Sequence, residues 1–278
     1  MISGSTRLAA IIGDPVRHSL SPFLHNTAYA ELGLDWIYVA FAVPASQTAA
    51  ALDAVRALDL VGLSVTMPHK TAAADGCDEL SADAAALHSV NTVTRLPDGH
   101  LHGDSTDGEG FVRSVQEAGH QLHGATALVL GAGGSARVVA RALARHGAAV
   151  TIAARRPEAA ADAAARAGGT TTAWTDRDAC AREAAIVVNA TPLGMDGQGV
   201  GALPLDGASL HPGQVVADLV YHPLETPLLT AARSAGAETV DGLGMLVHQA
   251  ALQVERWSGM AAPVGAMRAA VQSVLAAR

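Results

Sequence analysis

Aromatic residues are scarce in this chain: Phe, Trp and Tyr make up 3% of its 278 residues, although half of the residues are hydrophobic. A core of this composition has to be built from Ala, Val, Leu and Ile side chains. Cysteine is also scarce, because Cys77 and Cys180 are the only two and stand far apart in the sequence. This excludes a disulfide framework, argues against a structural zinc site and is typical of a reducing cytosol, so we expect a cytoplasmic protein.

Basic blocks and long apolar runs are missing as well. The formal net charge is −8, and no stretch concentrates Lys or Arg, which argues against a nucleic acid as the main partner. No stretch reaches the roughly 18 apolar residues that cross a bilayer, and the first residues lack the apolar region of a signal peptide. We therefore expect no membrane association and a small-molecule partner.

Strand-like and helix-like segments alternate along the chain in two successive series. The first series has strands near residues 7–12, 35–43 and 62–66, helices at 21–31 and 46–58, and a hairpin over 90–103. The second has strands at 125–130, 149–153, 186–189, 215–218 and 238–240, with helices at 108–118, 136–146, 159–167 and 227–235. The last segments, 245–257 and 264–277, are helical without a strand of their own. This pattern predicts two α/β domains with mostly parallel sheets, the terminal helices returning to the first.

A glycine turn follows the first strand of the second series. Leu128-Val129-Leu130 reads as a strand, Gly131-Ala132-Gly133-Gly134-Ser135-Ala136 as a turn, and the following residues as a helix. Gly131, Gly133 and Ala136 fit the G-x-G-x-x-G/A pattern, in which a tight turn brings the backbone and a helix N-terminus up to a dinucleotide pyrophosphate. An ordinary strand–helix turn is the alternative, and the strand and helix on either side favour the nucleotide.

The end of the next strand indicates which dinucleotide binds. An NAD site carries an acidic residue about 20 residues beyond the first glycine, on the ribose 2′-hydroxyl. Here Arg155-Arg156 occupy that region, and no Asp or Glu lies between Val150 and Pro157. Guanidinium groups form bidentate hydrogen bonds with a 2′-phosphate, so the arginine pair favours NADP over NAD. Two solvated arginines at a strand end are the ordinary alternative.

Polar residues of the first series lie where its strands end. Ser19 and Ser21 could bind a carboxylate, although Ser21 alone is better read as a helix N-cap. Lys70 follows a strand and a proline turn, where a lysine could exchange a proton with a carbonyl substrate or stabilise its negative charge; a surface lysine is the usual alternative. Asn91 and Asp107 add an amide and a carboxylate, and Asp107 could simply cap the next helix.

Together these residues resemble shikimate dehydrogenase in order and spacing over nearly the whole chain. Eight segments carry the resemblance: Ser19-x-Ser21-Pro22-x-x-His25-Asn26; Val65-Thr66-x-Pro68-x-Lys70; Val90-Asn91-Thr92; Thr106-Asp107-Gly108; Gly131-Ala132-Gly133-Gly134-Ser135-Ala136-Arg137; Asn189-Ala190-Thr191-Pro192-x-Gly194-Met195; Asp218-Leu219-Val220-Tyr221-x-Pro223-x-x-Thr226-Pro227-Leu228; and Asp241-Gly242-Leu243-Gly244-Met245-Leu246-Val247-x-Gln249-Ala250.

The resemblance implies the reversible NADP-dependent reduction of 3-dehydroshikimate to shikimate, a step of aromatic amino acid biosynthesis. It implies a substrate domain over 1–106, completed by 242–278, and a Rossmann-type NADP domain over 107–241. Lys70 would act as acid and base with Asp107 as its partner. The implied substrate ligands are Ser19, Ser21, Thr66, Lys70, Asn91, Asp107, Tyr221 and Gln249. The implied cofactor ligands are Gly131, Ala132, Gly133, Gly134, Ser135, Ala136, Arg155, Arg156, Thr191, Leu219 and Gly242.

Two departures from the family pattern bear on these assignments. Ser105 stands where the family often has Asn, and Ala154-Arg155-Arg156 replaces a frequent Asn-Arg-Thr. The alternatives are a quinate or shikimate dehydrogenase that uses NAD, and a non-catalytic NADP-binding regulatory homologue. The histidines show no metal-ligand spacing, so we expect packing or hydrogen-bonding roles for them and no metal. Monomer and homodimer both fit the sequence.

Overall fold

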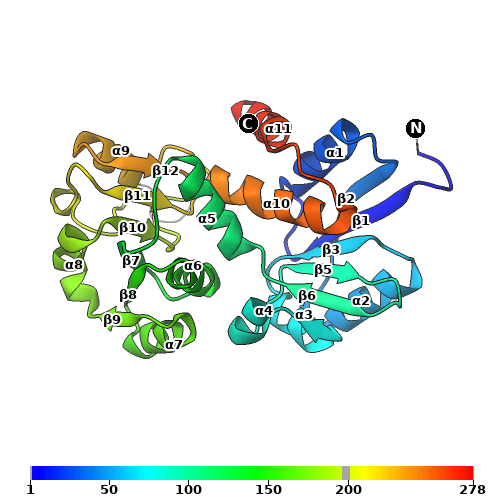
Figure 1. Cartoon of the computed structure of the whole chain (residues 1–278), viewed down its shortest axis with the longest axis horizontal. Coiled ribbons are helices and arrows are strands. Elements are labelled where there is room, and N and C mark those ends of the chain that lie inside the picture. Colours follow the sequence, from blue (N-terminus) through cyan, green and yellow to red (C-terminus); the bar gives the residue numbers. More distant parts are fainter. Residues whose placement is uncertain (1, 196–200, 278) are drawn as a thin grey trace. The chain divides into compact units, whose positions relative to one another are not determined.

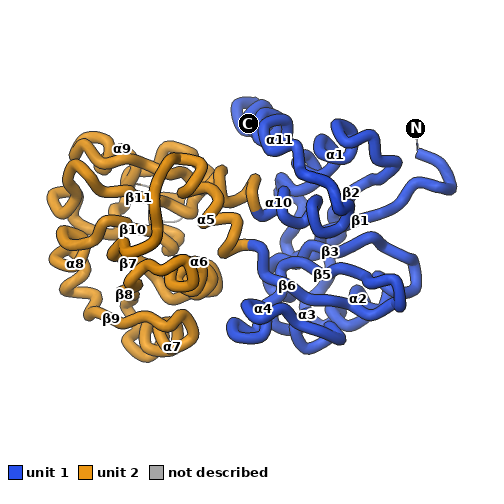
Figure 2. Tube along the Cα trace, viewed as in Figure 1, with its two compact units in different colours: residues 1–106, 249–278 blue, residues 107–248 orange. Residues whose placement is uncertain are grey.

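Two six-stranded sheets, each with helices packed on it, organise the computed structural model, which describes residues 2–195 and 201–277 (Figure 1). Each sheet lies in a compact unit of its own. Unit 1 contains residues 1–106 and 249–278, and unit 2 contains residues 107–248 (Figure 2). None of the described helices is long and apolar enough to cross a membrane.

The sheet of unit 1 is mixed, with strand order β2-β1-β3-β5-β6-β4. The pairs β1–β2, β1–β3 and β4–β6 are parallel, whereas β5 runs antiparallel to β3 and β6. The hairpin expected over 90–103 is confirmed by the β5–β6 pair. The strands are β1 (Arg7–Gly13), β2 (Trp36–Ala42), β3 (Gly62–Val65), β4 (Glu79–Leu80), β5 (Thr92–Arg95) and β6 (Leu101–Asp104).

Aliphatic side chains cover one face of this sheet, and aromatic side chains pack on the other. On one face, Ile12, Leu63 and Val65 belong to a buried cluster with residues of α2, α3 and α4. On the other face α1 packs on α11, and the indole of Trp257 lies directly on Gly62, where no side chain would fit. The helices are α1 (Ser21–Glu31), α2 (Thr48–Ala57), α3 (Lys70–Gly76), α4 (Ala82–Leu87) and α11 (Val264–Ala276).

Unit 2 has an entirely parallel sheet of order β12-β11-β10-β7-β8-β9. Its strands are β7 (Thr126–Leu130), β8 (Ala149–Ala153), β9 (Thr170–Thr172), β10 (Ile186–Asn189), β11 (Val215–Asp218) and β12 (Glu238–Val240). Its helices are α5 (Asp107–Glu117), α6 (Gly134–Arg145), α7 (Pro157–Ala167), α8 (Arg177–Glu183) and α9 (Pro227–Ser234), and α10 (Gly242–Ser258) starts here and ends in unit 1.

Alternate side chains of β7 enter different cores. Ala127 and Val129 pack in a cluster with α5, α6 and α7, whereas Leu128 and Leu130 pack in a second cluster with α8 and α9. A strand buried on both faces needs apolar residues at successive positions, which explains the uninterrupted apolar run that leads into the glycine turn.

Several short elements escaped the sequence-based expectation, namely α3, β4, α4, β9 and α8. Each spans seven residues or fewer, too short for hydrophobic periodicity to identify it. The expectation that Ser21 caps a helix is wrong. The cap position of α1 is Leu20, and Ser21 is the first helical residue, followed by Pro22 in the first turn.

Candidate functional site

Two of the predicted site residues of unit 1, Thr66 and Asn91, lie at the same edge of its sheet. Thr66 follows the last residue of β3, and Asn91 precedes the first residue of β5. Because β5 runs antiparallel to β3, with Ser64 opposite Thr92, these two positions meet at the same edge. Strand β6 ends there too, since Thr92 pairs with Asp104.

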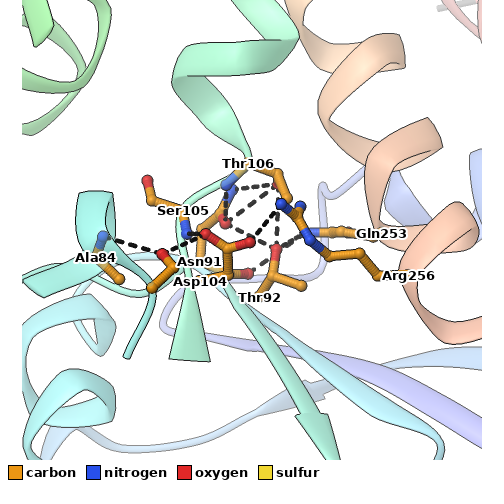
Figure 3. Close-up of polar contacts among 9 residues, drawn as sticks. Ala84, Asn91, Thr92, Asp104, Ser105, Thr106, Gln253 and Arg256 are labelled. Atoms are coloured by element: carbon orange, nitrogen blue, oxygen red, sulfur yellow. Dashed lines mark hydrogen bonds and ion pairs between the residues drawn. The ribbon is translucent and has the colours of Figure 1, made fainter. Parts of the chain in front are cut away.

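A buried hydrogen-bond network fixes the amide of Asn91 at this edge (Figure 3). Its Oδ1 atom accepts from the backbone N–H of Thr106 at 2.8 Å and from the hydroxyl of Thr92 at 2.8 Å. Its Nδ2 atom donates to Oγ1 of Thr106 at 3.0 Å. Asn91 therefore ties the start of β5 to the segment that leads into Asp107.

The same network continues into the core of unit 1. Oγ1 of Thr92 accepts from Nε2 of Gln253 at 2.9 Å, and Oε1 of Gln253 accepts from the hydroxyl of Ser64 at 2.7 Å. Ser64 in turn accepts from the hydroxyl of Tyr38 at 2.6 Å. Gln253 lies on α10, so this chain of hydrogen bonds joins α10 to three strands of the sheet.

Asp104 adds an ion pair beside this network (Figure 3). Its carboxylate pairs with the guanidinium of Arg256 and accepts from the hydroxyl of Ser81 at 2.6 Å and the backbone N–H of Ser105 at 2.6 Å. The Asp104 side chain is 8% exposed, so solvent screens this pair far less than a surface pair. Neither Arg256 nor Gln253 was identified from the sequence, because nothing near them marks a site.

Ser19 and Ser21 lie at the start of α1. Oγ of Ser19 accepts from the backbone N–H of Ser21 at 3.2 Å, and the carbonyl of Ser21 accepts from Nδ1 of His25 at 2.9 Å. His25 is completely buried and stacks on Tyr38 with ring centroids 4.0 Å apart. Burial lowers the pKa of His25 to about 4, so its ring is neutral near pH 7.

Thr66 and Lys70 lie on the segment that follows β3. A side chain on Gly13 would come within 2.5 Å of Cγ2 of Thr66, so the glycine makes room for the threonine. His69 is fully buried, with Nδ1 at 2.7 Å from the hydroxyl of Thr48 and Nε2 at 2.9 Å from the carbonyl of Val43. Lys70, the next residue and the first of α3, is half-buried.

Unit 2 contains a cavity of about 460 Å³ at the carboxyl ends of its strands. It is lined by Gly131, Ala132, Gly133, Ala154, Arg155, Arg156, Ala159, Trp174, Ala190, Thr191 and Pro192. The strand order reverses here, because β7 lies between β10 and β8, and parallel sheets bind ligands at such switch points. The structure thus gathers the glycine turn, both arginines and Thr191 around one pocket. Gly134, Ser135, Ala136, Leu219 and Gly242 are not among its lining residues.

The backbone at the glycine turn fits a dinucleotide. Gly131 has φ of +112°, and a side chain there would meet the carbonyl of Ala190 at 2.9 Å. Gly133 and Gly134 have open space where a side chain would stand, and α6 begins at Gly134. A phosphate can therefore approach the backbone N–H groups at the start of α6. The exposed Arg155 and Arg156 after β8 supply the cations that a 2′-phosphate needs.

A buried polar cluster supports the Thr191 side of the pocket. Oδ1 of Asn189 accepts from the N–H and the hydroxyl of Thr191 at 3.0 and 2.7 Å, and Nδ2 of Asn189 donates to Asp218 at 3.0 Å. Asp218 also accepts from the hydroxyl of Thr226 at 2.8 Å, and burial raises the pKa of its carboxyl. Asn189 and Asp218 end β10 and β11, so the sheet itself positions Thr191.

The other predicted residues lie elsewhere in the two units. Gly242 packs so closely on Leu219 that a side chain would come within 2.5 Å of the Leu219 carbonyl oxygen. Tyr221 and Asp107 belong to unit 2, and Gln249, on α10, belongs to unit 1; all three are half-buried. Within residues 2–195 and 201–277, no three His, Cys, Asp or Glu side chains gather as a metal site would require.

Comparison with known proteins finds one family throughout the chain. Residues 11–93 match the shikimate dehydrogenase substrate binding domain, residues 113–193 match shikimate / quinate 5-dehydrogenase, and residues 242–272 match the shikimate 5'-dehydrogenase C-terminal domain. A shikimate dehydrogenase (NADP(+)) of Acidiphilium cryptum is 44% identical over 260 residues, which cover 94% of this chain and 93% of that protein.

Two solved structures show the same architecture. Shikimate 5-dehydrogenase of Thermus thermophilus, in complex with NADP(H) and shikimate, superposes with a TM-score of 0.89 at 36% identity, covering 96% of this chain and 99% of the other. Quinate dehydrogenase of Corynebacterium glutamicum, in complex with NAD, superposes with a TM-score of 0.88 at 31% identity, covering 96% and 99%.

Proposed function

The chain belongs to the shikimate dehydrogenase family, and we propose that it catalyses the reversible reduction of 3-dehydroshikimate to shikimate with NADPH. NADP, when bound, supplies the hydride in reduction and accepts it in oxidation. Similarity over 94% of the chain, to an enzyme named for this substrate and this cofactor, supports the proposal. The arginine pair after β8 supports NADP rather than NAD.

Lys70 is the only lysine in the chain, and this observation carries the catalytic assignment. The chain has 18 Lys and Arg residues in total, and all except Lys70 are arginine. Arginine serves well wherever a fixed positive charge is enough, but it cannot give up a proton near neutral pH. A single remaining lysine, half-buried beside a sheet edge rich in hydroxyl and amide groups, suits a task that arginine cannot perform.

We assign proton transfer to Lys70. As an ammonium ion it stabilises the negative charge that grows on the substrate oxygen during reduction, and then delivers a proton to that oxygen. Asp107 is its proposed partner, which orients the ammonium group and accepts a hydrogen bond from a substrate hydroxyl. Ser19 and Ser21 are proposed to bind the substrate carboxylate.

The remaining substrate contacts are proposed for Thr66, Asn91, Tyr221 and Gln249. Asn91 is the best prepared of these, because its Oδ1 and Nδ2 atoms are already oriented by Thr92 and Thr106. A ring hydroxyl would meet a side chain whose donor and acceptor directions are fixed before binding, which lowers the entropic cost of recognition.

Steady-state kinetics with four substrate pairs test this function: shikimate or quinate, each with NADP⁺ or NAD⁺. We expect the highest kcat/KM for shikimate with NADP⁺. A preference for quinate would favour the quinate dehydrogenase alternative, and a preference for NAD⁺ would contradict the assigned cofactor. Tight NADPH binding without turnover of either substrate would favour a regulatory protein.

Two substitutions of the single lysine test the catalytic assignment. Lys70→Arg keeps the charge but removes the transferable proton, and Lys70→Ala removes both. General acid–base catalysis contributes about 10²–10⁴-fold, so both variants should lose kcat by that order with little change in KM. A Lys70→Arg variant with the wild-type kcat would show that only charge is needed and would overturn the proton-transfer role.

A further inference from the structure

Trp174 is the aromatic residue of the cavity in unit 2. It follows β9, the strand next to β8, and Arg155 and Arg156 follow β8 itself. Among the described residues that line the cavity, Trp174 alone is aromatic. Trp174 therefore lines the cavity beside the two arginines. In the strand order, β7 and β8 separate β9, which precedes Trp174, from β10, which precedes Thr191. Neither the glycine pattern nor the arginine pair accounts for it.

The indole is held firmly in place. The guanidinium of Arg177 lies 4.7 Å from the ring centroid of Trp174, and its Nη1 atom donates to the Trp174 carbonyl at 2.8 Å. Nε of Arg177 donates to the carbonyl of Pro204 at 2.9 Å, so Arg177 itself is anchored at two points. The ring also packs against the buried cluster of α8 and α9. A half-buried aromatic ring fixed in this way loses little freedom on contact with a ligand.

The position of the ring relative to the arginines indicates what it contacts. In a dinucleotide that carries a 2′-phosphate, the adenine base is attached to the phosphorylated ribose. If Arg155 and Arg156 bind the 2′-phosphate, the adenine base therefore lies close to them, along the same wall of the cavity. Adenine presents a flat π-surface, and an indole is the side chain best suited to stack on it.

We propose that Trp174 is the adenine-binding residue of the cofactor site. This role rests on the proposed NADP dependence and deepens it, since the ring and the arginines act on different parts of one ligand. Trp174 contributes affinity for NADP and NAD alike, because both contain adenine. Arg155 and Arg156 contribute only where a 2′-phosphate is present. Affinity and cofactor choice are thus carried by separate side chains on one wall.

Binding of two nicotinamide-free probes separates these contributions. ADP-ribose and 2′-phospho-ADP-ribose are titrated calorimetrically into wild type, Trp174→Leu, Trp174→Phe and Arg156→Ala. Stacking on an aromatic side chain contributes about five- to 150-fold in affinity, so Trp174→Leu should raise both Kd values by a similar factor in that range. Trp174→Phe keeps a ring and should stay within about threefold of wild type. Arg156→Ala, the matched control, should weaken only the phosphorylated probe.

Tryptophan fluorescence gives a readout that does not depend on the stability of the leucine variant. A base stacked on Trp174 should quench its emission when 2′-phospho-ADP-ribose saturates the wild-type protein, and this quenching should vanish in Trp174→Phe. Trp36 and Trp257 belong to unit 1 and serve as the unresponsive background. Unchanged Kd values in Trp174→Leu, or quenching that persists in Trp174→Phe, would overturn the role of Trp174.

The outcomes also distinguish this inference from the proposed reaction. Wild-type protein that binds the probes through Trp174 but does not oxidise shikimate would contradict the reaction and leave the adenine site standing. Protein that oxidises shikimate with NADP⁺ while Trp174→Leu keeps the wild-type Kd for both probes would contradict only the adenine site.

Discussion

His25 shows how burial dominates the protonation of one residue. Its ring is enclosed by Tyr38, Tyr29 and Trp257, and its Nδ1 atom bonds to the Ser21 carbonyl, one residue of the proposed carboxylate site. A neutral ring donates that bond through Nδ1–H. The energetic cost of charging the ring inside this aromatic pocket lowers its pKa to about 4, and the bond to Ser21 opposes this only in part.

This pKa predicts a dependence of stability on pH. His25 has a pKa near 6.5 in the unfolded chain and about 4 in the folded protein. Between these pH values the unfolded state therefore binds a proton at His25 that the folded state does not bind. The stabilising effect is complete above pH 6.5 and is lost as the pH falls, by about 3 kcal/mol in total between pH 6.5 and 4. Urea unfolding of wild type and His25→Phe over this range should show the variant losing less stability. Parallel pH profiles of the two proteins would contradict the prediction.

The candidate site residues differ in how visible they are from the sequence. Gly131, Arg155 and Thr191 stand in patterns with a known physical purpose, and the structure gathers them around one cavity. Trp174 and Gln253 stand in no such pattern, and only the folded chain brings Trp174 to the cavity and Gln253 to Thr92. A single polar or aromatic residue in a helix or turn carries no signal of its long-range partners.

At the scale of single elements, the turn after β7 depends on one glycine. Gly131 has a positive φ and abuts Ala190, so alanine at this position is strained and crowded at once. Gly131→Ala should destabilise unit 2 by about 1–3 kcal/mol and raise the Kd for NADPH at least about tenfold. Urea unfolding and fluorescence titration measure the two effects.

Gly265 provides the matched control for this substitution. It is the second residue of α11 and has open space around it, so Gly265→Ala should not destabilise the protein and should leave NADPH binding unchanged. If both alanine variants had the same stability and affinity as wild type, the turn would not depend on its glycine as we argue.

In unit 1, Gly13 at the end of β1 is likewise packed too closely to carry a side chain. A side chain on Gly13 would press on Thr66, a proposed substrate ligand, and on Val16. Gly13→Ala should therefore displace Thr66 and raise the KM for shikimate about fivefold, the effect of weakening one hydrogen bond, while the KM for NADP⁺ stays constant. Gly4→Ala, which meets no other atom, is the control, and equal KM values in both variants would exclude a displaced Thr66.

The described α-helices of eight residues or more could be predicted from the sequence, and those of seven residues or fewer could not. The helix expected at 136–146 is α6 and the strand expected at 149–153 is β8, because each repeats its apolar pattern often enough to be recognised. The two-residue β4 and the seven-residue α3 form because their neighbours pack on them: Leu80 pairs with Gly103 on β6, and Ala73 enters the core between strands and helices. Such tertiary support leaves no local pattern to detect.

At the scale of the whole molecule, unit 1 is assembled from two distant parts of the chain. Gln253 and Arg256 of the C-terminal part bond to Ser64, Thr92 and Asp104 of the N-terminal part. Gln253 is 1% exposed, so its replacement leaves buried polar groups without partners. Gln253→Leu should therefore destabilise unit 1 by about 1–3 kcal/mol per hydrogen-bonding group left unpaired.

The protease Lys-C measures this effect selectively, because its single cleavage site follows Lys70, in the first turn of α3. Brief digestion in increasing urea should cut Gln253→Leu at lower urea than wild type. The fluorescence of Trp174 in unit 2 should change at the same urea concentration in both proteins if the units unfold separately. Equal cleavage profiles would show that the Gln253 bonds do not stabilise unit 1.

The divided sequence of unit 1 has a consequence for how the protein is made. Residues 107–248 are synthesised as one unbroken stretch, so unit 2 has all of its described strands before residues 249–278 are made. Unit 1 begins before unit 2 and is completed after it, because residues 249–278 follow residues 107–248 in the chain. Until then its sheet lacks Trp257 over Gly62 and α11 against α1. Residues 1–106 are thus translated before unit 2 but fully enclosed after it, and until then their apolar face is exposed to aggregation.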